Sequence, residues 1–153
     1  MSDARARAWR LAGALCGLVV VLDQAAKALV EAHLLPGEEA HLLGPVDIVL
    51  SHNSGVAFGL ASGGGAGLVV LVGLALAVVA YLFARDPTRW GMWVAAGLLA
   101  GGALGNLADR IRADAVTDYI EIGAWPAFNL ADVAVTAGVL LLAASYLRDG
   151  ASQ

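Results

Sequence analysis

Charged side chains are scarce in this sequence of 153 residues. Nine residues are Lys or Arg and 13 are Asp or Glu, so 14% of the chain is charged and the formal net charge is −4. An ordinary soluble domain is about 25% charged, whereas 59% of this chain is hydrophobic. This composition excludes intrinsic disorder. It also argues against nucleic-acid binding, because the charge is acidic overall and no dense basic run occurs. It predicts a membrane protein.

Cysteine is almost absent as well. The single Cys16 excludes an internal disulfide and a thiolate metal cluster, and it lies in an apolar run that suggests a buried, inert thiol. The three histidines, His33, His41 and His52, lack the i, i+4 spacing of a helical zinc site. We therefore expect neither a metal nor a cofactor.

Four apolar segments are each long enough to cross a bilayer as a helix. They lie at approximately residues 11–30, 66–84, 90–108 and 125–147. Helices satisfy every backbone polar group internally, as hydrocarbon requires. The sequence thus predicts an all-α membrane protein, a four-transmembrane-helix bundle forming a single integral membrane domain over 1–153. The extracytoplasmic segment 31–65 is expected to contain a small outward-facing β-element, because 46–50 is β-prone.

Basic residues predict the orientation of this bundle. Six of the nine lie in segments that share one side of a four-span protein: Arg5, Arg7, Arg10, Arg85, Arg89 and Arg148. That side should be the cytoplasm, so both termini are predicted cytoplasmic and 31–65 and 109–126 outward. The first apolar run could instead be a cleaved signal peptide. A retained helix is favoured, because the run continues through a polar cluster into a full span.

Polar residues that are costly in a membrane gather at the outer end of the predicted bundle. A charge within a span costs about 2.5–3.5 kcal/mol on insertion scales and often marks a functional site. The residues are Asp23, Gln24, Lys27, Asn106, Asp109, Arg110, Asn129 and Asp132, with Asp118 in the loop between spans three and four. Spacings of three or four residues would let three helices each present a polar pair to one pocket. Asp23–Lys27 and Asp109–Arg110 could alternatively be structural ion pairs.

Asp118 and Asp132 form the natural chemical pair. Asp132 has no basic residue within three or four positions, so its partner must come from elsewhere in the fold, or it must be partly protonated. Two adjacent carboxylates cannot both ionise cheaply, so one can activate water while the other donates a proton. Competing nucleophiles are weaker, because Cys16 has no nearby histidine and the adjacent Ser51 and His52 would point to opposite faces of an extended segment.

Five short motifs, in order along the chain, carry a resemblance to a known family. They are Asp23-Gln24 with Lys27, Asn-Ser-Gly-Val-Ala-Phe-Gly at 53–59, the glycine-rich 101–110, Val-Thr-Asp-Tyr-Ile at 116–120 and Pro-Ala-Phe-Asn-Leu-Ala-Asp at 126–132. This set resembles the bacterial lipoprotein signal peptidases, the signal peptidase II family. The departures are mild: Thr117 and Tyr119 flank Asp118 where the family often has Val and Phe, and the 111–125 loop is compact.

The resemblance implies a membrane aspartyl endopeptidase of the bacterial inner membrane. It would cleave diacylglyceryl-modified prolipoproteins just before the lipid-modified cysteine and be a target of globomycin-type inhibitors. The implied catalytic residues are Asp118 and Asp132. The implied substrate-binding residues are Asn53, Asn106, Arg110 and Asn129, and the supporting residues are Asp23, Gln24, Lys27, Gly55, Phe58 and Asp109. Segment 51–59, with Phe58, is a candidate flap over the site. A monomer would suffice for a complete site.

Two other classes of function stay open on the sequence. A small transporter or proton pathway also uses intramembrane carboxylates. Against it, the polar residues crowd one face, and spans two and three carry no charge through their centres. The third possibility is a structural or assembly subunit whose charges pair with a partner.

Overall fold

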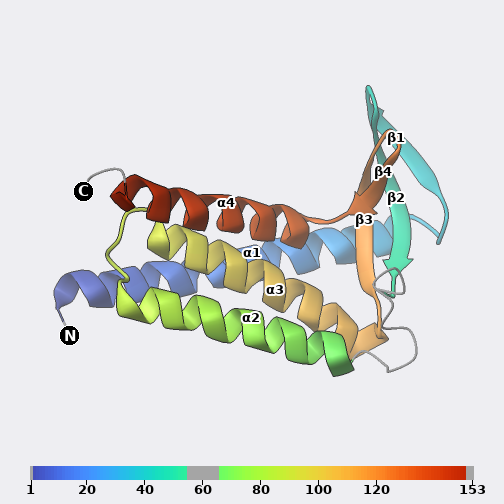
Figure 1. Cartoon of the computed structure of the whole chain (residues 1–153). Coiled ribbons are helices and arrows are strands. Elements are labelled where there is room, and N and C mark those ends of the chain that lie inside the picture. The colour runs from blue at the N-terminus through green and yellow to red at the C-terminus, as the bar shows by residue number, and fades with distance from the viewer. Residues whose placement is uncertain (1, 55–65, 151–153) are drawn as a thin grey trace.

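The computed structural model describes residues 2–54 and 66–150, which form four helices and four strands. In chain order these are α1 (Asp3–His33), β1 (Glu39–Leu43), β2 (Val46–Asn53), α2 (Ala66–Arg85), α3 (Met92–Ala113), β3 (Val116–Ile122), β4 (Trp125–Phe128) and α4 (Leu130–Gly150). Figure 1 shows the helices side by side, with the sheet at the end remote from both termini. Gly55, Phe58 and most of the candidate flap lie outside the described residues.

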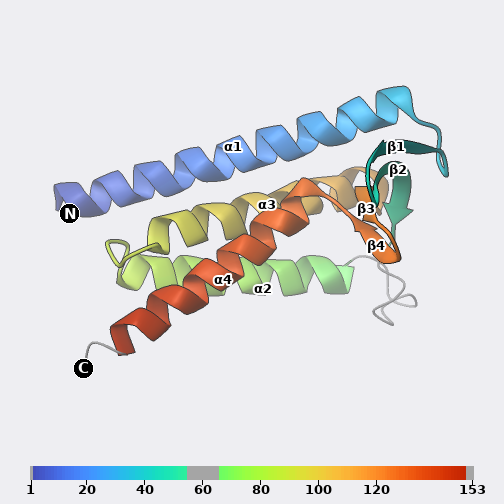
Figure 2. The ribbon, with the colours of Figure 1, turned by 90° about the horizontal axis from the view of Figure 1, so that it is seen from above.

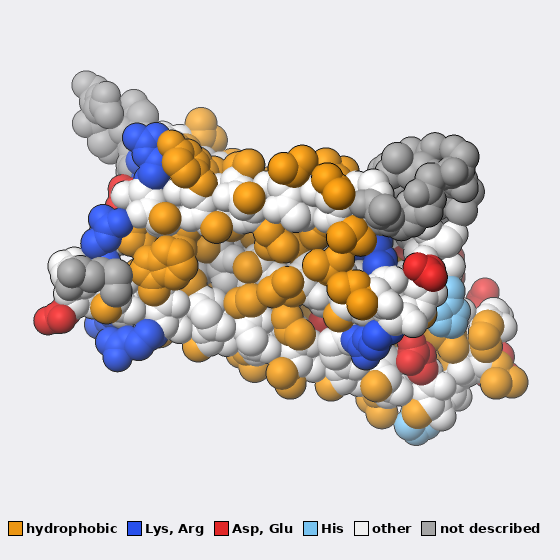
Figure 3. Space-filling view, turned by 90° about the horizontal axis from the view of Figure 1, so that it is seen from below, with side chains coloured by type: hydrophobic (Ala, Val, Ile, Leu, Met, Phe, Trp, Pro, Cys, Tyr) orange, Lys and Arg blue, Asp and Glu red, His pale blue; other side chains and the backbone are white. Residues whose placement is uncertain are grey.

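The surface of the helical body is apolar. Large hydrophobic side chains are exposed along the helices, among them Leu18, Val21, Leu29, Val70, Leu74 and Leu140. Figure 3 shows hydrophobic side chains over the middle of the molecule and basic side chains at both ends, with acidic side chains beside them at the end remote from the termini. A soluble monomer rarely exposes so large an apolar surface. Within the described ranges, Asp3–His33 and Leu130–Arg148 are long and apolar enough to span a membrane.

Helix α1 is the longest element and carries polar residues beyond the helical body. Ser2 caps its start, where the side-chain oxygen accepts a hydrogen bond from the Arg5 N–H. Its 31 residues correspond to about 46 Å, against about 30 Å of hydrocarbon. The last turns therefore reach the sheet, as Figure 2 shows. There Thr117 on β3 donates a hydrogen bond from Oγ1 to Glu31 Oε1 at 2.7 Å.

The sheet is larger than the sequence predicted. Its strands, all antiparallel, lie in the order β1-β2-β3-β4 within the described chain. The expected β-element at 31–65 is confirmed as β1 and β2. Strand β3 comes from the segment that we predicted as the loop before the fourth span, and β4 occupies the start of the predicted fourth span, 125–147. Asp118 consequently lies on a strand, where the β-branched and aromatic residues of 116–120 favour extended structure.

The fourth helix starts later than predicted. The apolar run from Trp125 suggested a span over 125–147, whereas Trp125–Phe128 is an edge strand and α4 begins at Leu130. Pro126 has no N–H to donate, which suits an edge strand. The side chain of Asn129 then caps the helix.

Glycines let α3 approach its neighbours closely. A Cβ at Gly101 would lie 2.6 Å from Cβ of Val19 on α1, and a Cβ at Gly102 would lie 2.4 Å from the carbonyl oxygen of Ala131 on α4. Only glycine permits these separations, as in small-residue packing of membrane helices. Helix α3 thus packs directly against α1 and α4 and brings together the ends of these helices that lie next to the sheet (Figure 2).

Replacing Gly102 with alanine should destabilise the protein. The added methyl group would overlap the α4 backbone, and overpacking of this kind costs about 1–3 kcal/mol. Gly73→Ala in α2 is the matched control, because a Cβ there meets nothing within 4 Å and alanine favours helix over glycine. Thermal unfolding in detergent should show a lowered midpoint for Gly102→Ala and an unchanged or raised one for Gly73→Ala. Equal midpoints for the two variants would contradict the packing.

Candidate active site

The first turn of α4 places Asp132 through a capping box. Asn129 Oδ1 accepts a hydrogen bond from the Asp132 N–H at 3.0 Å, and Asp132 Oδ2 accepts one from the Asn129 N–H at 3.2 Å. This reciprocal pair satisfies two backbone donors at the helix start. Asp132 thereby lies at the positive end of the helix dipole, which favours a carboxylate there.

The remaining amide groups of this turn bind side chains from other elements. The Leu130 N–H donates to Tyr119 Oη at 3.3 Å, and the Ala131 N–H donates to Asp23 Oδ1 at 3.0 Å. The start of α4 is therefore tied to both β3 and α1. The hydroxyl group of Tyr119 supplies one of these ties.

Strand pairing places Asp118 beside the same helix start. The β2–β3 register sets Ser51 opposite Asp118, so Asn53, two residues further on, is a diagonal neighbour on the same face of the sheet. Asn53 Nδ2 donates to Asp118 Oδ2 at 3.2 Å. Asn129 Nδ2 donates to Asp118 Oδ1 at 2.6 Å. Asp118 is 3% exposed, so both hydrogen bonds lie in a largely dry environment.

One fully buried residue, Asn129, therefore contacts both candidate catalytic carboxylates. Its side-chain Nδ2 donates to the Asp118 carboxylate and its backbone N–H donates to the Asp132 carboxylate, while its Oδ1 accepts from the Asp132 backbone N–H. Asn106 from α3 completes the link, because its Nδ2 donates to Asp132 Oδ1 at 2.8 Å. The partners that we expected Asp132 to find elsewhere in the fold are these neutral donors.

A buried lysine organises the layer behind the carboxylates. Lys27 Nζ lies 2.8 Å from Asp23 Oδ2, 2.6 Å from Asp109 Oδ2 and 2.9 Å from Asn106 Oδ1. An ammonium group has three donors, and each has a partner here. Because Lys27 binds Asn106 Oδ1, the amide nitrogen of Asn106 is directed at Asp132. Gln24 also contributes, donating to Asp109 Oδ1 at 2.9 Å.

The two anticipated ion pairs have different outcomes. Asp23–Lys27 is present. Asp109 pairs with Lys27, and more distantly with Arg112 at 3.7 Å, where we had considered its neighbour Arg110. The Arg110 side chain instead donates from Nη1 to the Asn106 carbonyl oxygen at 3.2 Å. It lies close enough to Asp132 and Asp118 for electrostatic attraction to both.

The surroundings of Asp118 favour its protonated form. Burial raises the pKa of the Asp118 carboxyl above its ordinary value, and the negative charge of Asp132 raises it further. Hydrogen bonds from Asn53 and Asn129 act in the opposite direction without cancelling the rise. A carboxyl that keeps its proton beside a second carboxylate is the arrangement that acid–base catalysis by two aspartates requires.

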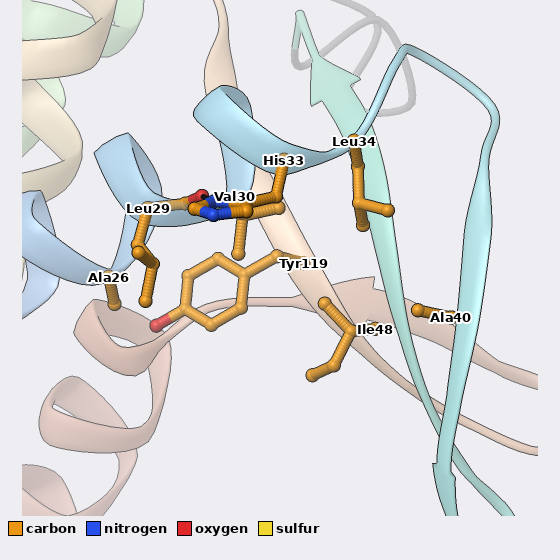
Figure 4. A pocket seen from close by; sticks show the side chains of 8 residues that line it. All are labelled: Ala26, Leu29, Val30, His33, Leu34, Ala40, Ile48 and Tyr119. Carbon is orange, nitrogen blue, oxygen red and sulfur yellow. Dashed lines mark hydrogen bonds between the residues drawn. The ribbon is translucent and has the colours of Figure 1, made fainter.

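Two apolar cavities adjoin this cluster. One, of about 410 Å³, has Asp132 at its edge and is lined otherwise by Trp125, Phe128, Val133, Thr136, Ala137 and Leu140. The other, of about 450 Å³, lies between α1 and the sheet, with Tyr119 in its wall (Figure 4). Strand alternation turns Tyr119 to the face opposite Asp118. The cavity of about 410 Å³ is therefore lined in part by the carboxylate residue Asp132. The cavity of about 450 Å³ is lined by Tyr119 and by neither candidate catalytic aspartate.

The predicted site residues within the described ranges come together at one end of the bundle. This holds for every catalytic, substrate-binding and supporting residue named from the sequence except Gly55 and Phe58, which are not described. Sequence reasoning missed the link from Thr117 to Glu31 and the capping contact of Tyr119. The alternation of side chains along 116–120 was the available signal, since it places these two residues on the face opposite Asp118.

Comparison with known proteins identifies the family. The model of the family described as signal peptidase (SPase) II matches residues 15–148. The chain belongs to the signal peptidase II family. The lipoprotein signal peptidase of Dehalococcoides mccartyi is 37% identical over 145 residues, covering 91% of this chain and 89% of the relative. That of Syntrophomonas wolfei is 41% identical over 137 residues, covering 87% and 90%.

Solved structures agree with this assignment to signal peptidase II. A bacterial membrane enzyme determined by the in meso method at 1.9 Å resolution matches with a TM-score of 0.84 and 30% identity, covering 90% of this chain and 93% of that one. The resemblance drawn from the five motifs is confirmed. The chain is a bacterial membrane protein of a family that removes signal peptides from prolipoproteins.

Removing the Lys27 charge should destabilise the protein strongly. Lys27→Met leaves Asp23 and Asp109 as buried carboxylates without their cation, and breaking a buried pair costs about 3–5 kcal/mol. Arg112→Gln is the matched control, because Arg112 also approaches Asp109 but its side chain is 63% exposed, and exposed pairs contribute about 0–1 kcal/mol. Thermal unfolding in detergent should separate the two variants clearly. Similar midpoints would contradict the role given to Lys27.

Proposed function

We propose that this protein is an aspartic endopeptidase in which Asp118 and Asp132 are the catalytic pair. The observation that supports the proposal is the shared contact with one buried residue, Asn129, whose side-chain amide binds the carboxylate of Asp118 on the sheet and whose backbone N–H binds the carboxylate of Asp132 on α4. The raised pKa of Asp118 supports Asp118 as the protonated partner. The donors from Asn106 and the start of α4 support Asp132 as the ionised one.

The proposed reaction needs only a water molecule and these two groups. Asp132 takes a proton from water as the oxygen attacks the scissile carbonyl carbon, and Asp118 gives its proton to the carbonyl oxygen. The resulting gem-diol collapses when Asp132 passes its proton to the leaving nitrogen and the diol returns one to Asp118. The peptide bond is thereby hydrolysed to a carboxyl group and an amine, and both aspartates return to their starting states.

Arg110 and the asparagines are proposed to position the substrate and the carboxylates. Arg110 is half-buried on the same side of α3 as Asn106 and attracts both aspartates electrostatically. Asn53 and Asn129 hold Asp118, while Asn106 and Asn129 hold Asp132. Lys27, Asp23, Gln24 and Asp109 would act through these residues as positioning groups, without touching the substrate.

The proposed topology has four membrane-spanning helices with both termini in the cytoplasm. Six of the nine basic residues belong to the end that holds the termini, which supports this orientation through the positive-inside rule, while the basic side chains at the other end lie among acidic ones (Figure 3). The sheet and the carboxylates would then lie at the outer face. A prolipoprotein anchored by its signal helix presents its cleavage point at that interface, next to the diacylglyceryl-modified cysteine. Globomycin-type inhibitors would occupy the same site, and a monomer contains every group named.

Neutralising either aspartate should abolish cleavage. Asp118→Asn and Asp132→Asn keep the size of the side chain but cannot exchange the proton, so cleavage of a purified diacylglyceryl prolipoprotein should fall by at least roughly a hundredfold. Asp47→Asn is the matched control, because Asp47 lies on the neighbouring strand and contacts exposed His41. It should keep wild-type activity. Thermal midpoints verify folding, and a folded dyad variant with substantial turnover would refute the assignment.

A further inference from the structure

We propose that the cavity beside α4 binds one acyl chain of the diacylglyceryl group on the substrate cysteine. We call it the α4 groove, defined by Trp125, Phe128, Asp132, Val133, Thr136, Ala137 and Leu140. The inference rests on the proposed peptidase function and assigns a part of the substrate to a part of the protein.

The groove follows one face of a single helix. Positions 133, 136, 137 and 140 are spaced i, i+3, i+4 and i+7, so their side chains form one stripe on α4. The stripe rises over seven residues, which is about 10 Å. It starts at the turn that holds Asp132 and runs toward the cytoplasmic end of the helix. Trp125 and Phe128 from β4 cover its outer end.

The residues that line the groove favour an apolar ligand. Among the described residues that line the groove, Asp132 at its outer end is the only charged one. Val133 and Leu140 are 44% and 66% exposed, and in a bilayer this exposed face is turned to lipid. An occupant that enters from the membrane must therefore be hydrocarbon along most of its length.

The groove is large enough to bind an acyl chain but too small to enclose a signal helix. Its volume of about 410 Å³ lies in the range of small-ligand sites, about 300–1,000 Å³. A signal helix has a diameter of about 10–12 Å with side chains, and one stripe of four residues cannot enclose it. A single acyl chain is thin enough to lie along the stripe. Ala137, near its middle, leaves the space that a larger side chain would fill.

The α4 groove is a better site for the acyl chain than the cavity of Figure 4, because the groove is continuous with Asp132. The diacylglyceryl cysteine directly follows the scissile bond, so its chains must start beside Asp118 and Asp132. The α4 groove includes Asp132 itself. The cavity between α1 and the sheet is lined by Tyr119, Ala26, Ile48 and their neighbours but by neither aspartate (Figure 4). A chain bound there would have to cross to the other face of β3.

Filling the groove should change the preference for acyl length. The test compares one prolipoprotein peptide carrying dipalmitoylglyceryl with the same peptide carrying diacetylglyceryl. For Ala137→Trp we expect KM for the palmitoyl substrate to rise roughly tenfold or more, in line with discrimination by apolar pockets. The kcat/KM for the acetyl substrate should stay at the wild-type value. Ala137→Leu should give a smaller change in the same direction.

The control fills the other cavity. Ala26→Leu places a larger side chain in the pocket of Figure 4 and should leave both substrates unaffected. An unchanged palmitoyl preference in Ala137→Trp, or a loss of that preference in Ala26→Leu alone, would overturn the proposal. Equal loss on both substrates would overturn it too, because a chain-binding groove cannot act on a substrate without a chain. Failure of the wild-type enzyme to cleave either peptide would instead refute the peptidase function itself.

Discussion

The structure depends on one buried asparagine that binds two carboxylates, one through its side chain and one through its backbone N–H. Asn129 is fully buried, caps α4 through Asp132 and donates a hydrogen bond to Asp118 on β3. Alone, each carboxylate would be a costly buried charge. Held by a common partner, they lie in unequal environments, because Asp118 is buried and Asp132 is partly exposed. The fold can be understood as the means of bringing a strand and a helix start to the same asparagine.

The packing of α3 makes this meeting possible. Close approach at Gly101 and Gly102 brings α1 and α4 against it, and a Cβ at Gly105 would lie 2.7 Å from Asp23 Oδ2. The polar end of the bundle is therefore too tight to admit a large side chain, and its charges must compensate one another. Lys27 does so by binding Asp23, Asp109 and Asn106 together. A layer in which one lysine pairs with two carboxylates thus supports Asp118 and Asp132.

The sequence predicted the helices and the membership of the site because both leave local signals. Apolar runs identify helices, and polar residues inside them are costly enough to be noticed. The strands β3 and β4 leave a weaker signal, since their pairing with β2 joins residues far apart in the chain. The start of α4 was placed too early because Trp125 and Phe128 continue the apolar run, whereas Pro126 and the cap at Asn129 decide the boundary. Lys27 contacts Asp109 and Asn106 because α1 packs against α3. Residue spacing within one helix does not predict which helices pack together.

The central claim is that Asp118 and Asp132 act as a pair with the proton on Asp118, and the pH dependence of kcat/KM tests it most directly. Loss of the Asp118 proton should cause the fall in kcat/KM on the alkaline side of the pH profile, the alkaline limb. Asn53 donates to Asp118 Oδ2 and so lowers the Asp118 pKa. Asn53→Ala removes this donor and should move the alkaline limb to higher pH. A limb that stays in place, or moves to lower pH, would contradict the account.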